Sequence, residues 1–292
     1  MQGERDLDRI RRALAGGPGS PCIGVTFLPD EAILALPCGA SHQVPLVSVV
    51  CSRLRPDFAF VRSWDPGANE TCAEVARCGT APLWVVRGAF DTVATARGWS
   101  ETLRATISEP EALAGALDDA VRVACATVRE GIECGAAGVV VGEDVAGADG
   151  PLLSPDYILS EIVPRVGRIA VTATEEGLPA VWHSDGDVRP FLAAAARAGL
   201  DAVHPGGLRA DLLGEVFLAA RSEGLALLGG IPAEVLREGG PAVIRAGVAA
   251  GVAAYGGGLL VSDDGGVTTG EELGMLVMAL QSARSAGPED GS

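Results

Sequence analysis

Short apolar runs alternate with longer segments of helical periodicity along most of the chain. Runs of Val, Leu, Ile and Ala without strict alternation are typical of parallel strands that are covered on both faces. The runs are Cys22–Leu28, Asp57–Val61, Leu83–Val86, Gly138–Val141, Ala180–Trp182, Ala202–Val203, Leu225–Leu228 and Leu259–Val261. Eight strands that alternate with helices predict a (β/α)8 TIM barrel, with an open doubly wound sheet as the alternative.

The helical segments are clearest in the second half of the chain. Glu109–Cys134 has apolar residues at helical spacing, acidic residues in its first turn and Gly135 directly after it. Ser154 and Pro155 suit the N-cap and first position of the next helix. Further helices are expected over residues 188–198, 208–223, 233–254 and 271–285. We therefore expect one barrel domain over residues 1–285 and a frayed tail over residues 286–292.

Composition and charge narrow the function classes. The formal net charge is −16 at pH 7, and none of the 22 basic residues is a lysine. The acidic balance argues against nucleic acid or an anionic membrane surface as a partner. The lack of lysine excludes Schiff-base chemistry and a phosphate-loop lysine, which leaves arginine as the permanent cation for an anionic substrate.

The cysteines and the apolar stretches indicate a cytoplasmic protein. Seven cysteines without a CxxC pair favour reduced thiols over a cysteine-rich zinc module. The N-terminal stretch MQGERDLDRIRRALAGG is charged and amphipathic, unlike a signal peptide. Ala246–Val261 is the most lipid-like stretch, but glycines 256–258 interrupt it. We interpret it as the end of a helix followed by a buried strand, not as a membrane span.

Polar residues directly follow the apolar runs. In a (β/α)8 barrel the residues at the C-terminal ends of the strands carry the chemistry. His183 and His204 end consecutive runs, so we expect both imidazoles on the same rim. The alternative for these residues is structural, since the arginines could pair with nearby acids and Asp263 could shape a turn. The candidates are Arg62, Asp65, Arg87, Glu143, Asp144, His183, Asp185, His204 and Asp263.

Several segments resemble the uroporphyrinogen decarboxylase superfamily, which includes methyltransferases that take a methyl group from a corrinoid protein. The strongest are PDFAFV (56–61), GAAGVVVGEDVAG (135–147), LLSPDYILSEIVPRV (152–166) and VWHSDGDVRP (181–190). The resemblance is closer to the methyltransferase-like branch than to the true decarboxylases. It implies a (β/α)8 barrel whose mouth faces the substrate, and a corrinoid protein as a partner.

The resemblance also implies a metal site, but with altered ligands. Thiol-methylating members carry zinc on His-x-Cys and a later Cys. His183 matches the histidine, whereas Asp185 stands at the place of the first Cys and SDDGGV (262–267) holds no later one. A thiolate-rich zinc centre is therefore excluded. His183, Asp185 and a carboxylate such as Glu143 or Asp263 would instead make a harder N/O site for a divalent metal such as Zn or Mn.

True uroporphyrinogen decarboxylases resemble this chain less closely in their functional residues. They carry an arginine pair near the first strand, an aspartate after the second and a histidine near the last. Residues 26–39 contain no arginine and SDDGG contains no histidine, while Asp65 can stand in for the aspartate. A substrate with many carboxylates would also meet a rim richer in acids than in arginines, which repels it.

We therefore predict an enzyme that moves a methyl group between a corrinoid protein and a small acceptor. One alternative is a cofactor-independent decarboxylase of a tetrapyrrole or smaller carboxylic acid that grips it with Arg62 or Arg87. Another is a barrel that binds a small molecule without catalysis, and a homodimer is compatible with all three. The expected catalytic residues are His183, Asp185, Glu143 and Asp65. The expected substrate contacts are Arg62, Arg87, Asp144, His204 and Asp263.

Overall fold

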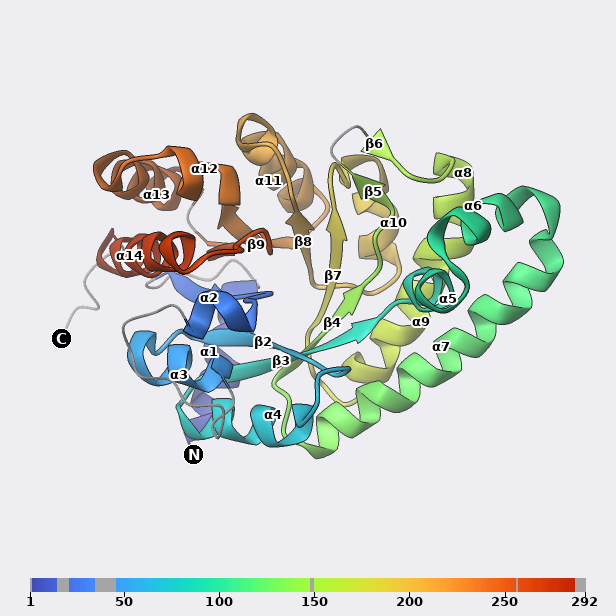
Figure 1. Ribbon diagram of the computed structural model, residues 1–292, viewed down its shortest axis with the longest axis horizontal. Coiled ribbons are helices and arrows are strands. Elements are labelled where there is room, and N and C mark those ends of the chain that lie inside the picture. The colour runs from blue at the N-terminus through green and yellow to red at the C-terminus, as the bar shows by residue number, and fades with distance from the viewer. Residues whose placement is uncertain (1, 15–20, 35–45, 148–149, 256, 287–292) are drawn as a thin grey trace.

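Eight parallel strands close into a barrel in the computed structural model, which describes residues 2–14, 21–34, 46–147, 150–255 and 257–286 (Figure 1). They follow one another around the barrel in chain order, and β1 closes it by pairing with β10. The (β/α)8 prediction is confirmed, since all eight apolar runs form strands, and the doubly wound alternative is wrong. The strands are β1 (Cys22–Val25), β2 (Phe58–Arg62), β3 (Ala81–Arg87), β4 (Gly138–Gly142), β7 (Ala180–Asp185), β8 (Ala202–Gly206), β9 (Ala226–Ile231) and β10 (Leu259–Asp263).

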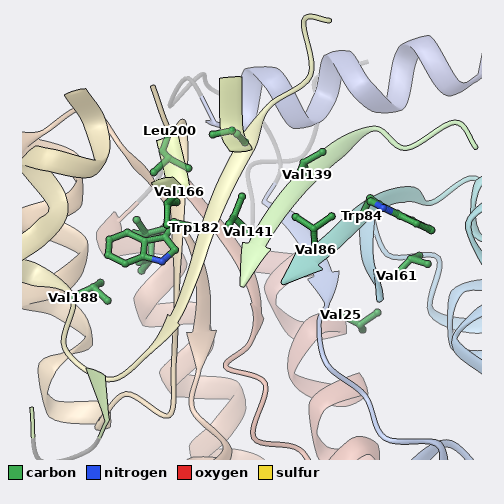
Figure 2. Packing of buried hydrophobic residues seen from close by; sticks show 14 of the residues in the cluster. Val25, Val61, Trp84, Val86, Val139, Val141, Val166, Trp182, Val188 and Leu200 are labelled. Atoms are coloured by element: carbon green, nitrogen blue, oxygen red, sulfur yellow. The ribbon is translucent and has the colours of Figure 1, made fainter. Parts of the chain in front are cut away.

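Side chains along the strands alternate between the barrel interior and the helical layer. In β3, Leu83 and Val85 belong to the inner apolar cluster, whereas Trp84 packs in the outer one. Figure 2 shows part of the outer layer, with Val139 of β4 and Trp182 of β7 among the labelled side chains. Because successive side chains of a strand point to opposite faces, this alternation also decides which polar residues at the strand ends face the interior.

Helices surround the barrel (Figure 1). The predicted Glu109–Cys134 helix is present as α7, and the Ser154 side chain caps α8 by accepting the N–H of Tyr157 at 3.3 Å. A π-helical turn, η1 (Ile158–Ile162), joins α8 to α9. The outer helices are α2 (Asp30–Leu34), α3 (Leu46–Leu54), α4 (Ala68–Arg77), α5 (Ala89–Arg97), α6 (Trp99–Ser108), α7 (Pro110–Glu133), α8 (Pro155–Tyr157), α9 (Val163–Thr174), α10 (Leu192–Arg197), α11 (Leu213–Ser222), α12 (Ala233–Glu238), α13 (Pro241–Tyr255) and α14 (Gly270–Ala286).

Some helix boundaries differ from the prediction. The helix expected over residues 233–254 is split into α12 and α13, because Gly239 is extended (φ −84°, ψ 136°) and Pro241 starts a new helix. The helices expected over 188–198 and 208–223 begin with 3-10 turns, η2 (Arg189–Phe191) and η3 (Ala210–Leu212). The predicted tail lies outside the described residues apart from Ala286, which ends α14.

The two ends of the barrel are built differently. At the N-terminal end, α1 (Gln2–Leu14) packs against the strands, with Ile10 1% exposed in the inner cluster and Arg9 paired to Asp57 at 2.8 Å. At the other end, a short antiparallel pair, β5 (Ala146–Gly147) and β6 (Gly150–Pro151), follows β4. His183, His204 and Asp263 lie toward this C-terminal end of β7, β8 and β10. Within the described residues, no helix has the length and apolar character needed to cross a membrane.

Candidate functional site

Two histidines from neighbouring strands meet inside the barrel. His183 and His204 are aligned in the parallel register of β7 and β8. Each lies two positions after an inner-cluster residue, Val181 or Ala202, so strand alternation turns both rings inward. The two Nδ1 atoms are 2.8 Å apart, and His183 Nδ1 is 3.0 Å from the carbonyl oxygen of His204. The two imidazoles thus form a hydrogen-bonded pair.

Aromatic rings enclose this histidine pair. The Phe27 ring centre lies 4.7 Å from that of His183, and the Phe60 ring meets His204 edge-on at 5.3 Å. Burial lowers the pKa of His183 to about 4, and burial together with the neighbouring His183 lowers the pKa of His204 to about 3. Both imidazoles are therefore neutral at pH 7, because their charged forms are poorly solvated here.

The outer edge of the His183 ring faces two carboxylates. His183 Nε2 lies 3.9 Å from Asp144 Oδ1 and 3.9 Å from Asp185 Oδ1. Asp144 follows the end of β4, and its Oδ1 accepts the backbone N–H of Asp185 at 3.0 Å. One ligand atom from each of the three residues lies within 4.8 Å of the other two. We refer to Asp144, His183 and Asp185 as the HDD cluster.

The charge state of the HDD cluster suits a divalent cation. Burial raises the pKa of Asp144, while burial and the charge of Asp144 raise the pKa of Asp185 to about 6. Both shifts follow from the cost of burying a negative charge, and for Asp185 also from the repulsion by the nearby Asp144 carboxylate. A neutral imidazole nitrogen and two carboxylate oxygens are ligands that Zn and Mn accept. The Asp185 side chain is 55% exposed, so the cluster opens to solvent.

Glu143 does not join the HDD cluster, which corrects its predicted place beside His183 and Asp185. Its carboxylate is fully buried and accepts the backbone N–H groups of Phe90 and Asp91 at 3.0 and 2.8 Å, in the first turn of α5. Burial raises the pKa of Glu143 to about 8. The alternation that continues past β4 turns Glu143 outward to this helix and turns Asp144 inward.

Asp263 reaches the site through its backbone. Its buried carboxylate accepts the N–H of Thr26 at 3.0 Å, the Thr26 hydroxyl, and the N–H of Gly265 at 3.1 Å. Burial raises the pKa of this carboxyl group. Its carbonyl oxygen lies 3.0 Å from His204 Nε2. The Asp263 side chain is therefore buried in contacts that hold β10 to the chain after β1, and its role as a substrate contact stays a prediction.

Arg62 and Arg87, which were predicted to bind a substrate, form ion pairs with acids at the ends of β2 and β3. Arg62 Nε lies 2.6 Å from Asp65 Oδ2, so the expected catalytic Asp65 is the partner of the expected substrate-binding arginine. Arg87 Nη1 lies 3.0 Å from Asp91 Oδ2, and its guanidinium stacks 4.2 Å above the Trp64 ring centre. These contacts correspond to the structural alternative considered for these residues.

Three residues of the site were missed by sequence reasoning. Phe27 and Phe60 stand within apolar runs and carry no signal that separates them from ordinary core residues. Gly206 ends β8, where a Cβ atom would overlap Asp185 Oδ1 and approach His183 Cε1 to 2.8 Å. The glycine that follows His-Pro was a usable signal, because a glycine is often required where another group approaches the backbone closely.

Comparison with known proteins identifies the family. Residues 71–271 match the profile of the family described as uroporphyrinogen decarboxylase (URO-D), which is more than half of the 292 residues and includes the HDD cluster. The chain belongs to the uroporphyrinogen decarboxylase family. The family suggested by the sequence segments is thereby confirmed. A search of curated proteins found no match.

Solved structures of low sequence identity share the barrel. A methyltransferase from Methanosarcina mazei aligns with a TM-score of 0.72 and 17% identity, over 96% of this chain and 98% of that one. A B12-independent methionine synthase from Shewanella sp. aligns with a TM-score of 0.53 and 8% identity, over 74% and 65%. A D-psicose 3-epimerase from Clostridium cellulolyticum gives 0.52 and 13%, over 90% and 96%. At these identities the likeness concerns the fold alone.

Proposed function

We propose that this protein is a methyltransferase-like enzyme that moves a one-carbon group between a corrinoid protein and a small acceptor. The HDD cluster would hold a divalent metal and, through it, the acceptor. Family membership and the similarity of the whole barrel to a methyltransferase support the reaction class. The enzyme would act at the C-terminal end of the barrel, where β4 and β7 deliver the cluster.

One observation carries the metal part of the proposal. An uncharged imidazole edge faces two carboxylate oxygens at 3.9 Å, too far for a direct hydrogen bond. Among the described residues, no arginine forms an ion pair with Asp144 or Asp185. Without a cation this arrangement is unfavourable, because two carboxylates face a neutral nitrogen and no positive charge offsets theirs. A divalent ion between the three atoms would bind to all of them.

The ligand set also bears on the acceptor. A bound divalent ion would lower the pKa of an N–H or O–H group on the acceptor and so make it a better nucleophile. Nitrogen and oxygen ligands prefer harder partners than the thiolates of a soft zinc site, so we expect an oxygen or nitrogen acceptor rather than a thiol. Asp185 is the most exposed member of the cluster, and the acceptor would approach on its side.

The decarboxylase alternative has less support from the site. It requires Arg62 or Arg87 to hold a substrate carboxylate, yet each guanidinium already binds an aspartate. A substrate carboxylate would have to displace Asp65 or Asp91 from its arginine. This exchange of one carboxylate for another would add little to the free energy of substrate binding.

Metal analysis of protein purified without added ions tests the proposal. We expect about one divalent ion per chain in the wild type, or saturable binding of added Zn²⁺ or Mn²⁺, and its loss in His183→Ala. Asp65→Ala is the matched control, because it removes a carboxylate at the same end of the barrel but outside the HDD cluster, and it should bind metal as the wild type does.

A methyl-transfer assay accompanies the metal measurement. Methylcobalamin serves as the donor, and small alcohols, amines and carboxylic acids serve as acceptors. Wild-type protein that neither contains metal nor binds added Zn²⁺ or Mn²⁺ would contradict the metal site. Release of CO2 from a carboxylic acid without any corrinoid would favour the decarboxylase, and ligand binding without turnover would favour the non-catalytic barrel.

A further inference from the structure

We infer that His204 is a positioning residue that fixes which nitrogen of His183 carries the proton. It holds the proton of His183 on Nδ1, so that the lone pair on Nε2 points at Asp144 and Asp185. His204 itself is 0% exposed and lies behind His183, away from the open side of the HDD cluster. It therefore acts through the imidazole of His183 and not on a bound molecule.

The first step concerns the proton of His204. Its Nε2 lies 3.0 Å from the carbonyl oxygen of Asp263, and a carbonyl oxygen only accepts hydrogen bonds. Nε2 of His204 must therefore carry the proton. Since a neutral imidazole has one N–H, Nδ1 of His204 is left as an acceptor. The Asp263 side chain secures this carbonyl by its bonds to Thr26 and Gly265.

The second step concerns the proton of His183, whose position follows from that of the proton on His204. Nδ1 of His183 lies 2.8 Å from the accepting Nδ1 of His204 and 3.0 Å from the carbonyl oxygen of His204. Both neighbours are acceptors, so Nδ1 of His183 must be the donor. Two independent acceptors thus agree on the same tautomer. A doubly protonated His204 would place two N–H groups against each other in a buried site.

The consequence appears at the opposite edge of the ring. With the proton on Nδ1, Nε2 of His183 has a free lone pair in the HDD cluster, where the carboxylate oxygens of Asp144 and Asp185 face it. A metal-binding histidine needs this lone pair, and its other nitrogen is usually held by a hydrogen bond. The benefit to metal binding rests on the proposed function, whereas the tautomer itself does not.

Nitrogen-15 NMR of histidine-labelled protein tests the tautomer directly. The chain has three histidines, and His42→Gln removes the one that lies outside the described residues. In metal-free protein at pH 7 we expect His183 in the Nδ1–H form and His204 in the Nε2–H form. Finding His183 in the Nε2–H form would overturn the inference, and this measurement needs no substitution within the site.

Substitutions of His204 test its effect on His183. In His204→Asn the side-chain oxygen can take the accepting place of Nδ1, so the tautomer of His183 and the metal affinity should stay near those of the wild type. In His204→Leu the 2.8 Å bond to the ring is lost and only the 3.0 Å bond to the backbone carbonyl remains, so the Nδ1–H form is favoured less strongly. We expect a mixture of His183 tautomers and about a tenfold loss of Zn²⁺ or Mn²⁺ affinity.

The outcomes separate this inference from the proposed function. If His183 has the expected tautomer but the wild type binds no metal, the role of His204 stands and the metal proposal fails. If metal binds and the His204→Leu variant keeps both the wild-type tautomer and the wild-type affinity, His204 is not the positioning residue. Circular dichroism on each variant shows whether the barrel is intact.

Discussion

The rim at β2 and β3 and the rim at β4 and β7 use carboxylates in opposite ways. At β2 and β3, Asp65 and Asp91 each face an arginine, so the charges are balanced within the protein. At β4 and β7, Asp144 and Asp185 face a neutral imidazole. A row of acids around a barrel mouth is therefore not one site. We propose that a cation binds at the β4 and β7 rim, where no arginine among the described residues pairs with Asp144 or Asp185.

Replacing the adjacent residues Glu143 and Asp144, one at a time, should give the largest effects. One variant should lose metal affinity and the other should lose stability. Asp144→Ala should weaken metal binding by about 100-fold, because it removes a ligand, and change the free energy of unfolding by only about 1 kcal/mol. Glu143→Ala should leave two amides of α5 without acceptors, destabilise the fold by about 3 kcal/mol and lower Tm by roughly 6–12 °C.

Metal titration and thermal unfolding of both variants measure these effects. A Glu143→Ala variant that keeps its Tm but no longer binds metal would place Glu143 in the metal site, against the geometry. An Asp144→Ala variant with unchanged metal affinity would remove Asp144 from the ligand set.

Lowering the pH should weaken metal binding at the β4 and β7 rim, by a smaller factor than the loss of Asp144 does. The pKa of Asp185 is raised to about 6, so this carboxyl group is ionised above pH 6 and protonated below it. Because a metal ligand must be deprotonated, metal affinity should fall by about tenfold per pH unit below pH 6 and level off above it. His183, whose pKa is lowered to about 4, should not contribute until lower pH.

Calorimetric titration of Mn²⁺ between pH 5 and pH 8, in roughly unit steps, measures this dependence. Asp185→Asn is the control, because it has no titrating carboxyl group and should bind weakly with a flatter pH profile. An affinity that falls as pH rises through 6 would contradict the assignment of Asp185 as a ligand.

Removing the arginines should give the smallest effect. Arg62→Ala and Arg87→Ala break partly exposed ion pairs, which contribute about 1 kcal/mol or less to stability. We expect kcat/KM for methyl transfer to change by less than about threefold. A tenfold or larger rise in KM for an anionic substrate would mean that this rim binds the substrate, and the contrast between the two rims would then be lost.

The sequence predicted the strands better than the direction of the side chains beyond them. Every apolar run became a strand, because a covered parallel strand must be apolar on both faces. Glu143 and Asp144 follow β4 together, and alternation makes them point in opposite directions, but β4 is apolar on both faces, so pattern alone did not say which of the two turns inward. The outward position of Glu143 also requires the start of α5 to lie beside it, since the free amides there bind its carboxylate. That position is set by packing of segments far apart in the chain.

By itself, the sequence determined the barrel, the family, and the presence of His183 with Asp185 in place of a sulfur ligand. These follow from local periodicity and from residue types at fixed spacing. Only the tertiary structure decided that His204 lies against His183 and that a carbonyl of β10 orients both rings. The tautomer of a histidine depends on the atoms around it, and here those atoms come from three strands that meet only when the barrel closes.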